Sequence, residues 1–220
     1  MTGVLEYPTF PTCAPVRMRA GLLELRDALP SDSEAFVEYW HSSGEQHLNF
    51  LGIDRAKLGT REETQLRFLR MVRVPGLDQS SVVITLVLNG RVVGYTNINM
   101  YGPYDNYIHF HTYRSSVRSS MTAYRGVERR TGGASVAPVA IGLILSTFFA
   151  LFPVQRLILQ TRTRNLGINR ALDHYMPVVE THWLENPNGL AEPGEFHIRY
   201  VYRDRAGLLV QRARQLAEGN

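Results

Sequence analysis

Two short segments carry residues whose types and spacing could do chemistry. The first is residues 129–134, Arg-Arg-Thr-Gly-Gly-Ala, directly ahead of a long apolar segment. Closely spaced glycines let backbone amides point into one cavity, and a helix that follows adds the positive end of its dipole. The pattern predicts a cradle for a pyrophosphate, although glycine pairs also occur in ordinary loops that cap a helix.

The second segment is a His-x-His pair, His109 and His111, within residues 107–113, which alternate like a strand. Two residues apart, both side chains belong to one face of the strand. A neutral imidazole can take a proton from an ammonium group near neutral pH. The pair could also line a polar sheet surface or hold zinc, but no third ligand follows at a recognisable spacing, and we assign no metal.

Alternation and turn signals predict the strands that position these residues. They fall at residues 22–26, 81–88, 91–100, 107–113, 154–161, 178–183 and 195–203. The dipeptide Asn89-Gly90 joins two long runs and predicts a hairpin closed by a type I′ turn. Helical spacing and capping residues predict helices after Asp32 and at residues 60–72, 136–152, 165–175 and 205–216.

This order of elements predicts the fold class. An antiparallel run that feeds one β-α-β unit implies an α/β domain with a mixed sheet, mainly antiparallel, and helices on both faces. Residues 1–20 contain three prolines and no apolar period, so we expect an irregular N-terminal arm ahead of one domain at residues 21–220.

Composition excludes disordered, collagen-like and repeat-array proteins. With 44% hydrophobic and 20% charged residues, the chain can bury a core of its own. Residues 136–152 are apolar enough to suggest a membrane span, but Pro138, Gly142 and the short length favour a buried core helix. One cysteine, Cys13, and no secretory signal pattern favour the cytoplasm.

Arginine supplies nearly all of the positive charge. Lys57 is the only lysine among 24 basic residues, and the net charge of +4 does not by itself indicate a nucleic-acid binder. The segment after residue 113 holds Arg114, Arg118, Arg125, Arg129 and Arg130. They fit a solvated charge run, contacts to nucleotide phosphates, or a patch for an acidic partner such as the acceptor stem of a tRNA.

Several short motifs together resemble one family. Arg129, Gly132 and Ala134 fit the phosphate-binding signature of the GNAT superfamily of acyl-coenzyme A dependent N-acyltransferases. The strand at residues 157–161, followed by Asn165 and a helix, resembles the ribosomal-protein N-acetyltransferase branch, and residues 23–32 resemble the family's first strand and turn. The resemblance covers residues 22–203 and implies a GNAT-like fold.

The resemblance also implies a function and a set of site residues. It implies an acyltransferase that moves an acyl group, most simply acetyl from acetyl-CoA or another acyl-CoA, to an amine of a small molecule or peptide. His111, with His109 beside it, would be the base. Leu172 stands where many members carry a tyrosine acid, so Tyr175 is the substitute candidate. The residues expected to bind the cofactor are Arg129, Arg130, Thr131, Gly132, Gly133, Ala134 and Asn165.

Two other functions fit the same residues. The long segment between Tyr113 and Arg129 departs from the family pattern and would suit an aminoacyl-tRNA dependent transferase on the same fold. The missing tyrosine would suit a GNAT-shaped binding protein without chemistry. We expect no membrane partner, place tRNA second to a coenzyme A donor, and leave a homodimer open.

Overall fold

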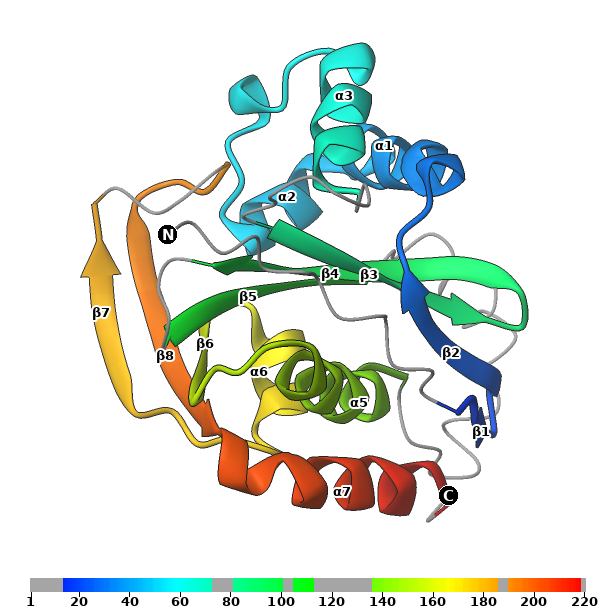
Figure 1. Cartoon of the computed structure of the whole chain (residues 1–220). Helices are drawn as coiled ribbons and strands as arrows, with labels where there is room; N and C mark the ends of the chain where they lie inside the picture. The colour runs from blue at the N-terminus through cyan, green and yellow to red at the C-terminus, as the bar shows by residue number, and fades with distance from the viewer. Residues whose placement is uncertain (1–13, 73–80, 101–104, 113–135, 186–189, 219–220) are drawn as a thin grey trace, which may run out of the picture.

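The computed structural model describes residues 14–72, 81–100, 105–112, 136–185 and 190–218, with the side chains of residues 81, 98–100 and 105–112 left aside. Its described residues form an eight-stranded sheet between two layers of helices (Figure 1). In spatial order the strands are β1 (Val16–Met18), β2 (Gly21–Asp27), β3 (Ser81–Leu88), β4 (Arg91–Met100), β5 (Asp105–Thr112), β6 (Arg156–Arg162), β8 (Gly194–Tyr202) and β7 (Glu180–Leu184). This architecture confirms the predicted mixed sheet.

The sheet contains one parallel pair, β5 with β6, among the strands that the structure describes. All other neighbouring strands pair antiparallel. The β3–β4 turn places Asn89 at φ 51° and Gly90 at φ 76°, which is the left-handed pair that a type I′ turn requires. The hairpin prediction is therefore confirmed, and one register shift between Leu86 and Val87 bends its strands.

One helical layer is formed by α1 (Ser33–Ser42), α2 (Glu45–Leu51) and α3 (Arg61–Met71). Thr60 caps α3 as predicted, since its hydroxyl accepts the Glu63 N–H while the Glu63 carboxylate accepts the Thr60 N–H. Phe36 packs its ring 4.8 Å from the rings of Phe68 and Tyr95, which joins α1, α3 and β4 in one apolar cluster. This layer covers the face of the sheet on which Tyr95 lies.

A buried carboxylate fixes the connection from β2 to α1. Asp32 is 5% exposed and accepts hydrogen bonds from Arg26, the Leu29 N–H and Thr85. Burial alone disfavours the ionised form of this carboxylate. The three donors outweigh burial and lower the pKa of Asp32. The start of the first helical layer is thereby tied to two neighbouring strands.

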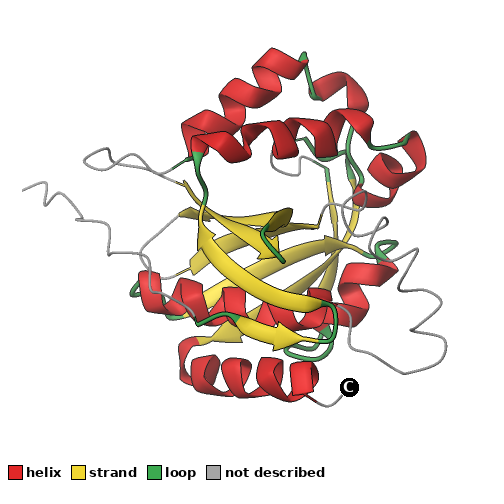
Figure 2. Ribbon diagram, turned by 90° about the vertical axis from the view of Figure 1, so that its right-hand side faces the viewer, coloured by secondary structure: helices red, strands yellow, loops and turns green. Residues whose placement is uncertain are grey.

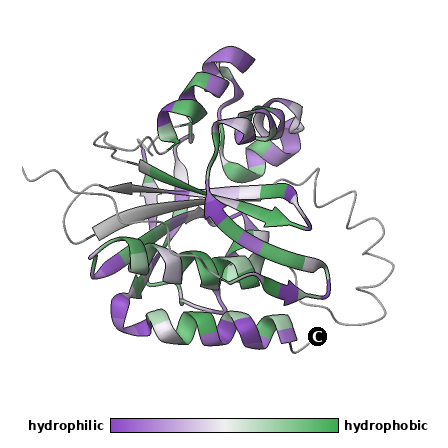
Figure 3. Cartoon of the chain, turned by 45° about the vertical axis from the view of Figure 1, so that its right-hand side comes forward, coloured by the Kyte–Doolittle hydropathy of each residue, from purple (hydrophilic) through white to green (hydrophobic). Residues whose placement is uncertain are grey.

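The other layer is formed by α5 (Val136–Leu151), α6 (Leu166–Leu172) and α7 (Ala206–Glu218). Figure 1 shows α5 between the sheet and α7, and Figure 3 shows the mixed faces of α7 beside the apolar α5. A helix covered on both sides needs no polar face, which explains the apolar run at residues 136–152. Among the described residues, no helix is long and apolar enough to cross a membrane.

Short 3₁₀ helices precede several of these elements. Pro30–Asp32 leads into α1, Arg55–Lys57 lies in the connection to α3, and Arg203–Arg205 leads into α7. Figure 2, turned by 90°, shows the twisted sheet between its helical layers. The order of long elements agrees with the prediction, while several boundaries do not.

Three features differ from the prediction for physical reasons: a strand, a helix and a helix end. The expected irregular arm is wrong at β1, because Val16 pairs with Leu23 and Met18 is buried in the core. The helix α2 lacks an extended apolar period and was not predicted. The helix expected at residues 165–175 ends at Leu172, where Arg199, 1% exposed, binds the Asp173 carboxylate and the Met176 carbonyl.

Candidate functional site

The parallel strands β5 and β6 separate along their length. They pair from Asp105 with Arg156 to Ile108 with Leu159, while β5 continues to Thr112 and β6 to Arg162. Over the remaining residues β5 stays paired with β4, and β6 stays paired with β8. Beyond these pairs no ladder joins the two strands, in the part of the chain that the structure describes. We call these two unpaired strand edges the β5/β6 cleft.

Buried polar contacts hold the end of β6 toward the α6 layer. The Thr161 hydroxyl donates to the Asn169 side-chain oxygen at 2.6 Å. The Asn169 amide donates to the carbonyls of Arg162 and Thr163 at 2.9 and 3.3 Å. Asn169 is 6% exposed, so each of these bonds replaces contacts with water that burial removes. The turn from β6 to α6 is thereby fixed beside the cleft.

Arg162 holds the same end of β6 on the opposite face. It is 6% exposed, and its guanidinium donates to the carbonyls of Glu192 and Pro193 at 2.5 and 2.9 Å. The guanidinium also lies 4.6 Å from the centre of the Phe196 ring. Burial, with a contribution from Arg164, lowers the pKa of Arg162. The end of β6 beyond its last pair with β5 is thereby fastened on both faces.

Glycines make room for this arginine. A Cβ on Gly52, at the end of α2, or on Gly194, at the start of β8, would overlap the Arg162 guanidinium. Beside Gly52, Ile53 forms an antiparallel bridge with Ala191, and the Glu192 N–H donates to the Gly52 carbonyl at 2.7 Å. Arg162 therefore joins α2 and the segment before β8 at the cleft end of the sheet.

The two predicted histidines lie in the open half of β5. By register, His111 pairs with Tyr95 and His109 pairs with Asn97, and both follow the last pair with β6. Their side chains lie outside the described residues. The expected phosphate cradle, Arg129 to Ala134, lies outside them as well; α5 begins directly after it, at Val136.

Asn165 lies at the start of α6, next to the anchored end of β6. Its carbonyl accepts the Asn169 N–H at 3.1 Å, while its side chain makes no capping bond. The structure thus brings Asn165 to the same end of the sheet as the open half of β5. Its role toward a cofactor stays a prediction.

The hydroxyl of Tyr175 is engaged with α5. The phenol donates to the Pro138 carbonyl in the first turn of α5 at 2.6 Å. Burial raises the pKa of Tyr175, so the phenol stays protonated at neutral pH. Leu172, at the position where the family tyrosine was expected, is fully buried in the core. The contact with Pro138 joins the turn after α6 to α5.

Sequence reasoning missed Arg162 and Asn169. A basic residue at a strand end is normally exposed to solvent. An asparagine inside a short helix has no strong preference for a particular local contact. The available signal was the position of Arg162 at the end of a strand with an apolar centre, residues 157–159. In the described part of the chain, no group of three His, Cys, Asp or Glu residues could hold a metal ion.

The sequence matches no protein-family model and no curated protein. The structure is similar to Mycobacterium smegmatis RimJ in complex with CoA-disulfide, with a TM-score of 0.65 and 18% identity over 93% of this chain and 96% of that one. A GNAT-family acetyltransferase from Bacillus anthracis gives 0.60 and 15%, over 87% and 99%. Spermidine N-acetyltransferase from Vibrio cholerae in complex with CoA and spermine gives 0.59 and 10%, over 84% and 97%.

These similarities extend over most of the chain and over nearly the whole of each neighbour. At such low identity they establish the arrangement of elements rather than the chemistry. The chain has the GNAT fold, as the sequence resemblance implied.

Proposed function

We propose that the protein transfers an acyl group from a coenzyme A thioester to an amine. The observation that carries the proposal is the β5/β6 cleft, where two strand edges stand open at the end of a parallel pair. An extended donor chain fits such an opening because unpaired strand edges offer backbone donors and acceptors in a row. A backbone N–H of the open half of β5 would then hold the thioester carbonyl.

The neighbours support coenzyme A as the carrier of the acyl group. RimJ and the spermidine acetyltransferase are both complexes with a coenzyme A species. In this chain, the amides and arginines of residues 129–134 would hold the pyrophosphate, with the N-terminus of α5 directly behind them. Asn165, whose side chain makes no capping hydrogen bond, would contact the donor at the start of α6.

His111 is the proposed base. His111 lies in the open half of β5, beyond the last pair with β6, and its register partner on β4 is Tyr95. The amine nitrogen would attack the thioester carbon and form a tetrahedral oxyanion while the imidazole takes the amine proton. The carbon–sulfur bond then breaks, and the leaving thiolate takes its proton from the imidazolium.

Tyr175 is the other proton donor to consider. Its protonated phenol already donates to the Pro138 carbonyl, and that bond must break before the proton can reach a thiolate. We therefore give Tyr175 a positioning role between α5 and the turn after α6. Its use as a general acid stays a prediction from the sequence.

The decisive experiment measures coenzyme A binding and then turnover. A ligand that binds only the folded state raises Tm by mass action, so coenzyme A should stabilise the protein. Gly132→Asp places a carboxylate where the pyrophosphate is proposed to lie and should abolish the shift. Release of free thiol from acetyl-CoA with a library of small amines and peptides then identifies the acceptor. Binding without turnover of any acyl donor would instead favour a binding protein.

A tRNA-dependent donor predicts a different result. If Arg118 and Arg125 contacted RNA, tRNA would bind with a strong salt dependence, and replacing both by alanine would flatten it. We expect no RNA binding. A tight, salt-dependent tRNA complex without coenzyme A binding would overturn the proposal.

A further inference from the structure

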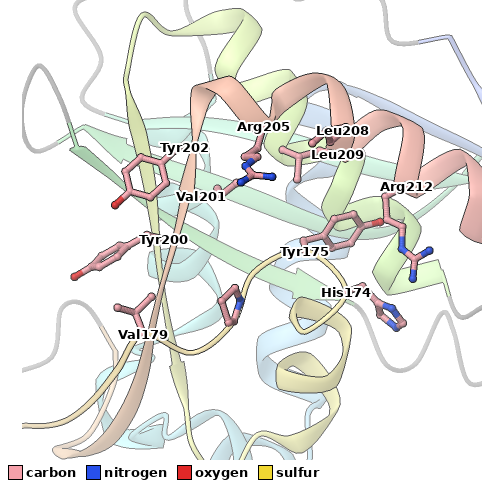
Figure 4. A pocket seen from close by; sticks show the side chains of 11 residues that line it. His174, Tyr175, Val179, Tyr200, Val201, Tyr202, Arg205, Leu208, Leu209 and Arg212 are labelled. Carbon is pink, nitrogen blue, oxygen red and sulfur yellow. The ribbon is translucent and has the colours of Figure 1, made fainter.

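A groove far from the cleft lies between the turn after α6, β8 and α7. It encloses about 500 Å³, and Figure 4 shows its lining side chains. This volume is in the range of sites for small molecules. By register, Tyr202 on its wall pairs with Arg156 at the start of β6, whereas β5 and β6 separate beyond Leu159. We call it the α7 groove; it lies at the other end of β6 from the β5/β6 cleft.

The α7 groove has an apolar base and an apolar rim. Val201 and Leu209 line it and are each 3% exposed, so they belong to the core beneath. Val179, Tyr202 and Leu208 line it too, but 53%, 51% and 53% of their surface is exposed. Large apolar side chains gathered at the mouth of a hollow indicate a surface that a ligand covers.

The charged residues that line the groove all have one sign. They are Arg205 and Arg212, with His174 beside them, and no Asp or Glu is among the lining residues. Three carboxylates adjoin lining residues in sequence, and none of them lines the groove. Asp173 pairs with Arg199, Glu180 contacts His182 and accepts a hydrogen bond from the lining residue Tyr200, and Asp204 is exposed beside Arg205.

Both arginines are available to a ligand. Within the described residues, neither Arg205 nor Arg212 forms an ion pair, and both are exposed. Arg205 directly precedes α7, whose N-terminal dipole adds positive potential at the same place. In Figure 4, Arg212 and His174 lie toward one end of the groove, and Tyr200 and Tyr202 toward the other.

We propose that the α7 groove binds a small organic acid, with its aromatic or branched apolar body against Leu208, Leu209 and Val201 and its anionic group at Arg205 and Arg212. Apolar burial supplies most of the affinity, and the guanidinium groups select the anion, since exposed ion pairs contribute little by themselves. The proposal does not depend on the acyl transfer: Tyr175 also lines the groove, but the residues proposed to bind the acid are others.

A fluorescence titration with 1-anilinonaphthalene-8-sulfonate, an aromatic anion that brightens in apolar surroundings, tests the proposal. Its neutral relative N-phenyl-1-naphthylamine is the ligand control and should bind more weakly. Added salt should weaken binding of the anionic probe but not of the neutral one, because exposed charges are screened. Replacing Arg205 and Arg212 together with glutamine should raise the Kd of the anion roughly tenfold. Arg214→Gln, an exposed position of the same helix outside the groove, should leave it unchanged.

A second variant adds a negative charge at the rim. Leu208→Glu places a carboxylate beside the arginines and should also raise the Kd roughly tenfold. The matched control is Leu66→Glu on α3, since both leucines are 53% exposed and neither change disturbs the core. Unchanged binding by the arginine double variant would refute the site. Displacement of the probe by excess coenzyme A would place it in the β5/β6 cleft and would also refute the proposal.

Discussion

Replacing Gly52 with alanine should be far more costly than its backbone conformation alone requires. Gly52 has φ 70°, where an L side chain is strained, and its Cβ would overlap the Arg162 guanidinium. The substitution therefore strains the backbone and also drives Arg162 out of its site. The two effects can be separated because the chain contains a matched glycine.

That control is Gly90, in the turn between β3 and β4. It has φ 76°, nearly the same conformation, and a Cβ there would meet nothing within 4 Å. Gly90→Ala should cost only the left-handed backbone strain, about 1–2 kcal/mol. Gly52→Ala adds the loss of the two bonds from Arg162 to the carbonyls of Glu192 and Pro193.

The added cost follows from the environment of the guanidinium. Hydrogen bonds to a charged group contribute about 1.5–3 kcal/mol each. Part of that sum is offset, because the buried Nε of Arg162 makes no hydrogen bond within the described residues and regains water when displaced. We expect a net added cost of about 2–4 kcal/mol, and hence a total of about 3–6 kcal/mol for Gly52→Ala.

A double-mutant cycle in urea, followed by tryptophan fluorescence, measures this directly. In an Arg162→Ala background no guanidinium remains to be displaced, so Gly52→Ala should cost only as much as Gly90→Ala. If Gly52→Ala alone does not fold, the double variant still provides the test. It should be less stable than Arg162→Ala by no more than the backbone strain. Equal costs for Gly52→Ala and Gly90→Ala in the wild-type background would refute the role given to Arg162.

Three further predictions address the reaction and the packing. His111→Ala should lower kcat/KM by about 10²–10⁴ and remove the acidic limb of the pH profile, and His109→Ala should cost less; equal small losses would show that both only line the sheet. Tyr175→Phe should cost about 1 kcal/mol of unfolding free energy and leave kcat within about tenfold, whereas a hundredfold fall would identify a general acid. Because the pKa of Asp32 is lowered in the folded state, its ionised form stabilises the fold above the unfolded pKa of about 3.9, and that stability is lost as the pH falls through the folded value. Asp32→Asn should therefore be less stable at neutral pH and lose less on acidification in urea titrations, and an unchanged pH dependence would contradict the ion pair with Arg26.

The sequence by itself determined the elements whose signals are local. The Asn89-Gly90 turn needs only two residues with positive φ, and the cap at Thr60 needs only a partner three residues on. The apolar run at residues 136–152 predicted a buried helix. A helix that is covered on both sides needs no polar face. The alternating strands and their order then limited the fold to a mixed sheet with helices on both faces, which the structure confirms.

Only the tertiary structure decided where β5 and β6 separate and which contacts fix the end of β6. Arg162 binds a carbonyl 30 residues away and lies against the glycine that caps α2, and no local pattern predicts that pairing. The strand β1 and the end of α6 likewise depend on partners distant in sequence, Leu23 and Arg199. Periodicity fixes which face a residue occupies, but a cleft is set by the partners that each strand finds once the chain has folded.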